Sequence, residues 1–364
     1  MIICIYTKIV FEIFVYSIIV GRIYFMLTWQ LWSGTAEFWD QTLSSAVDCS
    51  VFQSYGWGEY KSRTNWIPLR YCCLDKRGNP VGMAQLLVKS MPFRTAFIWV
   101  PGGLVFRFPE SRESDITELV QNLIAAVRIN YPRSLIRFNS QTPNHSLLSY
   151  GFNRVCLRPY CKINSGYTVR IKLDTSVATQ RAKMTAKHRY YTKKAAGAAI
   201  TWVTGSSDQL LRDLNGLHQE MVIKKQLQLI ATAFEELQCM RDTLGSKVLI
   251  LVGYIDNKPV TGCLVLLFGS TAFYMVASTG RQGREVSAAY AMFERLMQEL
   301  IEQGVTDFDF GGIDPVRREA AGVNHYKCGF GGEIVEQLGE WESAPSEWFR
   351  LAVNLALRFR GALP

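Results

Sequence analysis

The sequence lacks the paired cysteines and histidines that build zinc sites and disulfide frameworks. Its nine cysteines are odd in number and scattered, and no Cys-x-x-Cys pair occurs among them. The four histidines, at positions 145, 188, 218 and 325, have no ligand spacing among themselves. Structural zinc needs closely spaced ligands, and disulfide-rich domains need an even set of cysteines. These absences predict a reduced, cytosolic protein without a bound metal.

Low-complexity segments are also absent, and charged residues make up only 20% of the chain. Apolar residues make up 48% of the 364 residues, enough to bury a sizeable core, which excludes a disordered chain. At roughly 150 residues per domain, about two domains are expected. Lys and Arg (40) outnumber Asp and Glu (31), so the net charge is +9. A modest positive charge favours a polyanionic partner: phosphate, RNA or an anionic membrane face.

A long hydrophobic run occurs only near the start of the chain. Residues 9–21 (IVFEIFVYSIIVG) are apolar except for Glu12, and Lys8 and Arg22 bracket them. A spanning helix needs about 20 apolar residues, and no small-residue cleavage site follows. Residues 1–25 are therefore interpreted as an apolar leader. Three alternatives stay open: translation begins at Met26, the leader is a weak membrane anchor, or it forms a packed hydrophobic helix.

Two distant stretches of the chain repeat the same order of elements. Turn residues separate β-branched and aromatic runs in 69–99 and again in 248–275, and each set predicts a three-strand antiparallel meander. An amphipathic helix and a strand follow each meander, the strands at 134–139 and 305–310. Agreement through six elements indicates a duplicated α/β unit. Residues from Ala344 onward predict a terminal amphipathic helix.

Five blocks of sequence together resemble the Fem family, aminoacyltransferases that build peptidoglycan interpeptide bridges from aminoacyl-tRNA. They occur in family order between residues 27 and 341: 52–61 (FQSYGWGEYK), 100–105 (VPGGLV), 189–195 (RYYTKKA), 307–313 (DFDFGGI) and 326–333 (YKCGFGGE). The resemblance implies an α/β (α+β) fold of two tandem GNAT-like domains, each a mixed, largely antiparallel sheet flanked by helices. The expected division is residues 27–162 plus 342–364 for the first domain and 163–341 for the second.

The same resemblance implies a set of substrate-binding residues. A lysine in the position of Lys61, close to Trp66, contacts phosphates of the nucleotide-linked or lipid-linked cell-wall precursor, and an ammonium group suits a diphosphate. Lys224 is the nearest match to a second phosphate ligand, usually an arginine. Tyr274 and Tyr290 correspond to cleft-wall residues. Each has a plainer alternative, because surface lysines are often only solvated and strand tyrosines often only core.

Basic residues crowd the segment that enters the second domain. Lys183, Lys187 and Lys194 recur at helical spacing on one side of a single predicted helix, with Tyr191 interleaved. A basic face with aromatic residues can follow a phosphate backbone, either a tRNA acceptor stem or the anionic precursor; a solvated face between domains is the alternative. The polyanion-binding residues expected here are Arg181, Lys183, Lys187, Arg189, Lys193 and Lys194.

Three residues are expected to carry the chemistry. Lys327 matches the family lysine thought to stand beside the reacting groups, where a cation stabilises negative charge on an ester carbonyl. Alternation in residues 307–310 puts Phe308 and Phe310 on one face of a strand and Asp309 on the other, so that Asp309 lines a cleft. Asp314 either lines the same cleft or forms a turn before Pro315. Asn139 stands where the family has an aspartate, and asparagine cannot act as a general base.

No cofactor is expected. In residues 281–289, large side chains fill the loop where CoA-dependent relatives have small residues close to a pyrophosphate. The expected reaction is tRNA-dependent aminoacyl transfer to the amine of a peptidoglycan precursor. The alternatives are an N-acyltransferase of exopolysaccharide or amino-sugar assembly that uses acyl-CoA or another carrier, and a non-catalytic tRNA- or precursor-binding module. The expected partners are the precursor, aminoacyl-tRNA and, peripherally, the inner membrane face.

Overall fold

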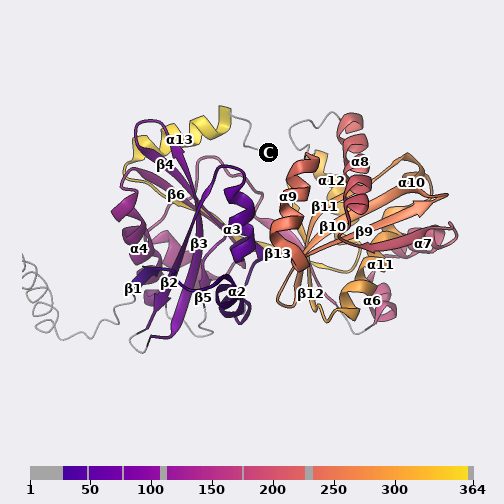
Figure 1. Cartoon of the computed structure of the whole chain (residues 1–364), viewed down its shortest axis with the longest axis horizontal. Helices are drawn as coiled ribbons and strands as arrows, with labels where there is room; N and C mark the ends of the chain where they lie inside the picture. The colour runs from indigo at the N-terminus through magenta and orange to yellow at the C-terminus, as the bar shows by residue number, and fades with distance from the viewer. Residues whose placement is uncertain are drawn as a thin grey trace, which may run out of the picture.

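The computed structural model describes residues 28–46, 49–75, 78–106, 113–173, 176–225 and 233–359. The predicted leader and the alternative start at Met26 lie outside these residues. Two bodies of sheet and helix stand side by side, and strand β13 runs between them (Figure 1). Within the described ranges, no helix has both the length and the apolar character that crossing a bilayer requires.

The first half of the chain contains the predicted meander, helix and strand. The meander strands pair in antiparallel register, and β6 then adds parallel to the last of them. The elements of this half are β1 (Thr28–Leu31), α2 (Ala36–Ser44), α3 (Tyr55–Ser62), β2 (Ile67–Leu74), β3 (Pro80–Met91), β4 (Thr95–Gly102), β5 (Val105–Phe106), α4 (Glu113–Asn130), β6 (Ser134–Pro143) and α5 (Ser146–Asn153).

The second half repeats this order after an added group of helices. The turn of its first hairpin is Asp256–Asn257, both residues at positive φ, which Asp and Asn tolerate in tight hairpins. Its elements are β7 (Tyr167–Lys172), α6 (Val177–Lys183), α7 (Ala186–Ala196), β8 (Thr201–Gly205), α8 (Asp208–Lys225), α9 (Phe234–Leu244), β9 (Val248–Ile255), β10 (Lys258–Phe268), β11 (Thr271–Thr279), α10 (Arg281–Glu285), α11 (Ala288–Glu302), β12 (Asp307–Ile313) and α12 (Ala321–Cys328).

Strand β13 (Glu333–Ser343) joins the two sheets. Its first residues pair with β7 and its last with β6, so the strand order runs β1-β2-β3-β4-β6-β13-β7-β12-β11-β10-β9-β8 without a break. The predicted terminal helix follows as α13 (Glu347–Phe359) and lies along the first half (Figure 1). The fold class is confirmed as a mixed, largely antiparallel α/β fold. Because the sheet is continuous, the boundaries at residues 162/163 and 341/342 stay predictions.

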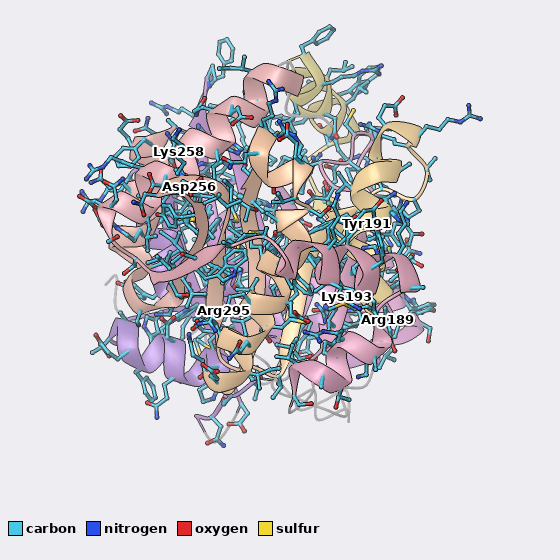
Figure 2. All side chains as sticks on the ribbon, turned by 90° about the vertical axis from the view of Figure 1, so that its right-hand side faces the viewer. Arg189, Tyr191, Lys193, Asp256, Lys258 and Arg295 are labelled. Atoms are coloured by element: carbon cyan, nitrogen blue, oxygen red, sulfur yellow. The ribbon has the colours of Figure 1, made fainter. Side chains whose placement is uncertain are left out.

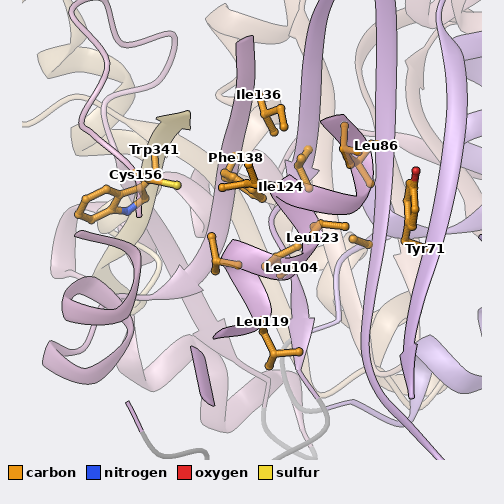
Figure 3. Close-up of a cluster of buried hydrophobic side chains, with 14 of the residues drawn as sticks. Tyr71, Leu86, Leu104, Leu119, Leu123, Ile124, Ile136, Phe138, Cys156 and Trp341 are labelled. Atoms are coloured by element: carbon orange, nitrogen blue, oxygen red, sulfur yellow. The ribbon is translucent and has the colours of Figure 1, made fainter. Parts of the chain in front are cut away.

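Four clusters of apolar side chains, among the described residues, hold these layers. One lies between the first sheet and helices α4 and α5, where Phe138 meets Phe152 edge to face at 5.5 Å (Figure 3). Another packs α11 onto the second sheet through Phe293, Phe308 and Phe310. A small cluster packs α13 against Phe97 and Leu135. The last core is shared by both halves: α2 and α3 of the first and α8 and α9 of the second contribute residues to it, and α3 contacts α9 directly. Burial of this shared apolar surface fixes how the halves face each other.

The two copies differ in their parallel strand pair. In the first half, β4 and β6 stay in register from Ala96–Ser134 to Gly102–Ser140. In the second half, β11 and β12 pair only from Thr271–Asp307 to Phe273–Asp309. Beyond Asp309 these two strands separate. The second sheet therefore opens at the residue that the sequence predicts to line a cleft.

Candidate active site

Asp309 lies where strands β11 and β12 part. Its side chain is only 6% exposed, and Oδ1 accepts hydrogen bonds from the backbone N–H of Gly311, at 2.7 Å, and from the hydroxyl of Thr168. The guanidinium Nε of Arg170 is 3.4 Å from Oδ2. Gly311 has φ +71°, a conformation that glycine adopts without strain. The local backbone and strand β7 thus hold a buried carboxylate in a fixed orientation.

Lys327 lies on α12 beside this carboxylate. Its Nζ donates a hydrogen bond to the carbonyl of Gly312 at 2.8 Å. Burial lowers the pKa of Lys327 to about 8, and the nearby Asp309 carboxylate acts in the opposite direction. The site therefore contains an ammonium group that is poised to lose its proton just above neutral pH, next to the open end of β12.

A cavity of about 590 Å³ lies between the two halves, with Asp309 in its wall. Arg170 and Lys183 line it from the second half, and Ser50 and Gln141 line it from the first. Of the residues expected to bind or react, Asp309 and Lys183 belong to its lining. The cavity is both polar and apolar in character, as a site for an extended, partly charged substrate should be.

Lys61 and Trp66 lie at the end of α3 and the start of β2. Lys61 Nζ is 4.5 Å from the ring centroid of Tyr60 and 5.0 Å from that of Trp57, and burial lowers its pKa. Lys89 of β3 extends over Trp66, at 5.1 Å from its ring. The structure thus brings two ammonium groups together around aromatic rings. Lys89 was not predicted as a site residue. The signal that could have found it is a lysine near the end of a long apolar strand.

The two tyrosines contribute to aromatic packing. The ring of Tyr274 packs against Phe308 at 5.8 Å and Phe310 at 5.4 Å, and burial raises its pKa well above the usual value. The ring of Tyr290 lies tilted against Tyr191, at 4.9 Å, and meets Tyr326 edge to face, at 5.5 Å. Both tyrosines lie within reach of α12 and β12. Their ring contacts agree with the plainer interpretation, in which they are core residues.

Asp314, Asn139 and Lys224 remain predicted site residues with different surroundings. The Asp314 carboxylate accepts hydrogen bonds from the backbone of Val316 and Arg317, so it forms a turn. Asn139 is half-buried in β6, opposite Glu340 of β13. Lys224 lies in the last turn of α8, and its side chain is outside the described part of the structure.

The expected single basic helix is wrong, because the segment forms two helices. Helix α6 ends at Lys183, and α7 begins after Thr185, whose hydroxyl accepts the backbone N–H of His188 at 3.3 Å. Lys183 therefore lies on a different helix from Lys187 and Lys194. Figure 2 looks onto this outer face and labels Arg189, Tyr191 and Lys193 on α7.

Several of the basic side chains bind the protein itself. Arg181 pairs with Glu294, Arg189 donates to the carbonyls of Ala182 and Met184, and Lys194 donates to the carbonyl of Glu285 at 3.3 Å. Lys187 and Lys193 point outward and are exposed. The surface available to a polyanion on α7 is thus smaller than the sequence indicates.

Arg170 and Thr168 were not predicted from the sequence. They alternate along β7 with the buried Val169 and Ile171, and this polar alternation inside an apolar strand is the signal that could have found them. Arg170 also donates to the carbonyl of Gln141 at 2.7 Å, which ties the strand of Asn139 to the Asp309 site. In the described part of the chain, no three His, Cys, Asp or Glu side chains group as metal ligands.

Comparison with known proteins finds one family match within the chain and several solved structures of similar fold. Residues 252–357 match the model of the FemAB family. No curated protein matches the chain significantly. The structure of FemX is similar with a TM-score of 0.77 and 14% identity, over 89% of this chain and 100% of that one.

Two other solved structures share the fold at lower similarity. L-PGS from Bacillus licheniformis has a TM-score of 0.53 and 13% identity, over 88% of this chain and 96% of that one. A tandem GNAT protein from the clavulanic acid biosynthesis pathway has a TM-score of 0.53 and 10% identity, over 88% and 99%. The expected tandem GNAT-like fold is confirmed.

Proposed function

We propose that this chain, which matches the FemAB family model over residues 252–357, is an acyltransferase that transfers an aminoacyl group from tRNA to the amine of a peptidoglycan precursor. The observation that carries this proposal is that Lys327 and Asp309 meet the open end of β12: Asp309 lines the cavity, and the Lys327 ammonium is held by the Gly312 carbonyl and feels the Asp309 charge. This arrangement offers a cation fixed at the end of a strand, which suits direct attack of an amine on an ester.

The reaction then needs only positioning and electrostatic stabilisation. The acceptor amine attacks the ester carbonyl, a C–N bond forms, the C–O bond to the tRNA ribose breaks, and the departing ribose oxygen takes the proton from nitrogen. Lys327 stabilises the negative charge that develops on the carbonyl oxygen. The Asp309 carboxylate already has three donors, so it acts on Lys327 through its negative charge, which favours the ammonium form, rather than by taking a proton. Asn139 cannot take it either.

The second half favours a donor other than CoA. A CoA pyrophosphate needs backbone N–H groups at the start of the helix after β11. Here the backbone N–H of Arg281 donates to the carboxylate of Glu220 at 3.0 Å, and Arg284 pairs with the same oxygen at 3.2 Å. An internal carboxylate thus holds the position that a phosphate would take.

The experiment offers each donor with each acceptor. Radiolabelled aminoacyl-tRNA and acyl-CoA are incubated separately with nucleotide-linked and lipid-linked precursor. Label is expected in the precursor only from aminoacyl-tRNA. Tight binding of acetyl-CoA with no transfer from charged tRNA would overturn the proposal and favour carrier-dependent N-acylation, for which Asn139 in place of the family aspartate is the supporting residue.

The exposed lysines of α7 provide a test of tRNA binding. Reversing both charges, Lys187→Glu with Lys193→Glu, is expected to raise KM for aminoacyl-tRNA about tenfold and to reduce the slope of log K against log salt by about 2, because each phosphate contact contributes about 0.9 to that slope. The kcat value should not change. The matched control reverses two other exposed lysines, Lys162 and Lys258. An equal rise in KM for the control would contradict a site on α7.

A further inference from the structure

His188 lies on the inner side of α7, although the outer side of that helix is basic and exposed. Its side chain has no solvent exposure, and the reaction described above makes no use of it. The imidazole is surrounded by the rings of Phe330 at 4.7 Å, Tyr290 at 5.0 Å and His325 at 5.5 Å. A buried polar ring in this position must have both nitrogens satisfied to be tolerated.

Both ring nitrogens have partners, and the partners fix which nitrogen carries the proton. Nε2 is 3.0 Å from the backbone carbonyl of Tyr326, and Nδ1 is 2.8 Å from the hydroxyl of Thr185. A carbonyl only accepts, so Nε2 carries the hydrogen and Nδ1 accepts the hydroxyl proton. Burial lowers the pKa of His188, which keeps this neutral form at neutral pH.

The ring also fits against the chain that follows α12. A Cβ atom added at Gly329 would lie 1.9 Å from Cε1 of His188, so any other residue there would push the imidazole away. Helix α6 and the link between α6 and α7 add one hydrogen bond each to the same stretch. The backbone N–H of Thr185 donates to the carbonyl of Gly329 at 2.9 Å, and Gln180 donates to the carbonyl of Phe330 at 3.3 Å.

One of these contacts satisfies a carbonyl in the last turn of α12, and the other two hold the residues that follow the helix. The last four carbonyls of an α-helix have no partner within the helix, and α12 is only eight residues long. Three side-chain or backbone donors from the α6–α7 segment supply partners for carbonyls at positions 326, 329 and 330. Lys327 is the residue next to Tyr326, inside the fastened stretch.

We propose that His188 is a positioning residue, which fastens the end of α12 to α7 and thereby holds the Lys327 ammonium against the Gly312 carbonyl, near the Asp309 carboxylate. The reacting groups never touch His188. It acts through the Tyr326 carbonyl and the backbone of Gly329. The same residue connects the helix that presents Lys187 and Lys193 to the helix that presents Lys327. Its effect on catalysis rests on the proposed function, whereas its effect on Lys327 can be measured without any substrate.

The test replaces His188 by phenylalanine, which fills a similar volume but makes neither hydrogen bond. The pKa of the Lys327 amine is measured by competitive labelling with acetic anhydride across pH, followed by mass spectrometry. It is expected to rise from about 8 toward the ordinary 10.5, because a loosened α12 exposes the amine to water. The kcat for transfer is expected to fall about 10- to 100-fold with KM little changed, since a small misplacement of a catalytic group is costly.

Two further variants separate positioning from simple destabilisation. His188→Gln can still offer an N–H near the Tyr326 carbonyl, so it should restore much of the kcat and the low Lys327 pKa. His218→Phe removes another buried imidazole, one that contacts Ser278 of β11 rather than α12. It should lower stability without changing Lys327. If His188→Phe does not fold, Thr185→Ala should give the same two changes at smaller size.

The outcomes distinguish failure of the positioning role from failure of the proposed function. An unchanged Lys327 pKa in His188→Phe, or an equal shift in His218→Phe, would overturn the positioning role. A shifted Lys327 pKa in a protein that transfers nothing from aminoacyl-tRNA would support the positioning role and reject the proposed donor.

Discussion

Replacing Lys327 by alanine is expected to lower kcat by about 100- to 1000-fold, the usual effect of removing one group that stabilises a developing oxyanion. The KM values should change by less than about threefold, because the interaction forms fully only in the transition state. Lys327 is half-buried and its Nζ is held by the Gly312 carbonyl at 2.8 Å, so little reorganisation precedes the reaction. Steady-state kinetics with either precursor measures both parameters.

The pH dependence of the same reaction follows from the lowered pKa of Lys327. The amine is protonated below about 8 and neutral above it, so the stabilising charge is lost as the pH rises through that value. The rate of the native enzyme should therefore fall above about pH 8. Lys327→Arg keeps its charge throughout this range, so its lower rate should show no such decline.

Lys162→Ala, at an exposed lysine of the first half, provides the control and should leave kcat unchanged. Full activity of Lys327→Ala would contradict the catalytic role. Retained binding of tRNA and precursor, with no transfer by either the native chain or the variant, would instead identify a binding module.

The meanders, helices and parallel strands were predictable because they depend on local patterns. Turn residues such as Asp256 and Asn257 end apolar runs where hairpins form, and alternation in β12 separates Phe308 and Phe310 in the core from Asp309 at the cavity. Successive side chains of a strand point to opposite faces, so apolar neighbours in the core predict which face the residue between them occupies. The location of Asp309 was therefore predictable, whereas its partners Thr168 and Arg170, far away in sequence, were not.

The break between α6 and α7 could not be predicted from the same patterns. The sequence between Arg181 and Lys194 contains no proline or glycine, so local propensity favours one continuous helix. Thr185 ends that continuity because its N–H bonds to the Gly329 carbonyl and its hydroxyl caps α7. The first contact is tertiary, whereas the second is a local cap three residues along the chain. The burial of His188 could not be predicted from local patterns either, because its partner Tyr326 lies 138 residues away.

Arg137 was noted only as part of the strand before Asn139, yet it is the centre of a buried ionic network. Its side chain has no exposure, and Nη2 is 2.7 Å from Glu342 and 2.8 Å from the amide oxygen of Asn354. Glu340 lies 3.5 Å from Nη1. Arg350 of α13 pairs with Glu342 at 3.3 Å from the other side. The network connects β6, β13 and α13.

Replacing Arg137 by methionine is expected to lower the free energy of unfolding by about 3–5 kcal/mol, because removing one partner leaves buried carboxylates without their charge. Urea denaturation measures this loss. The loss should shrink as the pH falls, since Glu340, whose pKa burial already raises, then protonates more readily in the folded chain than in the unfolded one. The control is Arg281→Met in the exposed Arg281–Glu285 pair, for which a change of less than about 1 kcal/mol is expected. Two results would contradict this role of Arg137: a loss of unfolding free energy no greater than that of the control, or a loss that grows in acid. Either would mean that α13 docks through its apolar contacts with Phe97 and Leu135 and not through the buried charges.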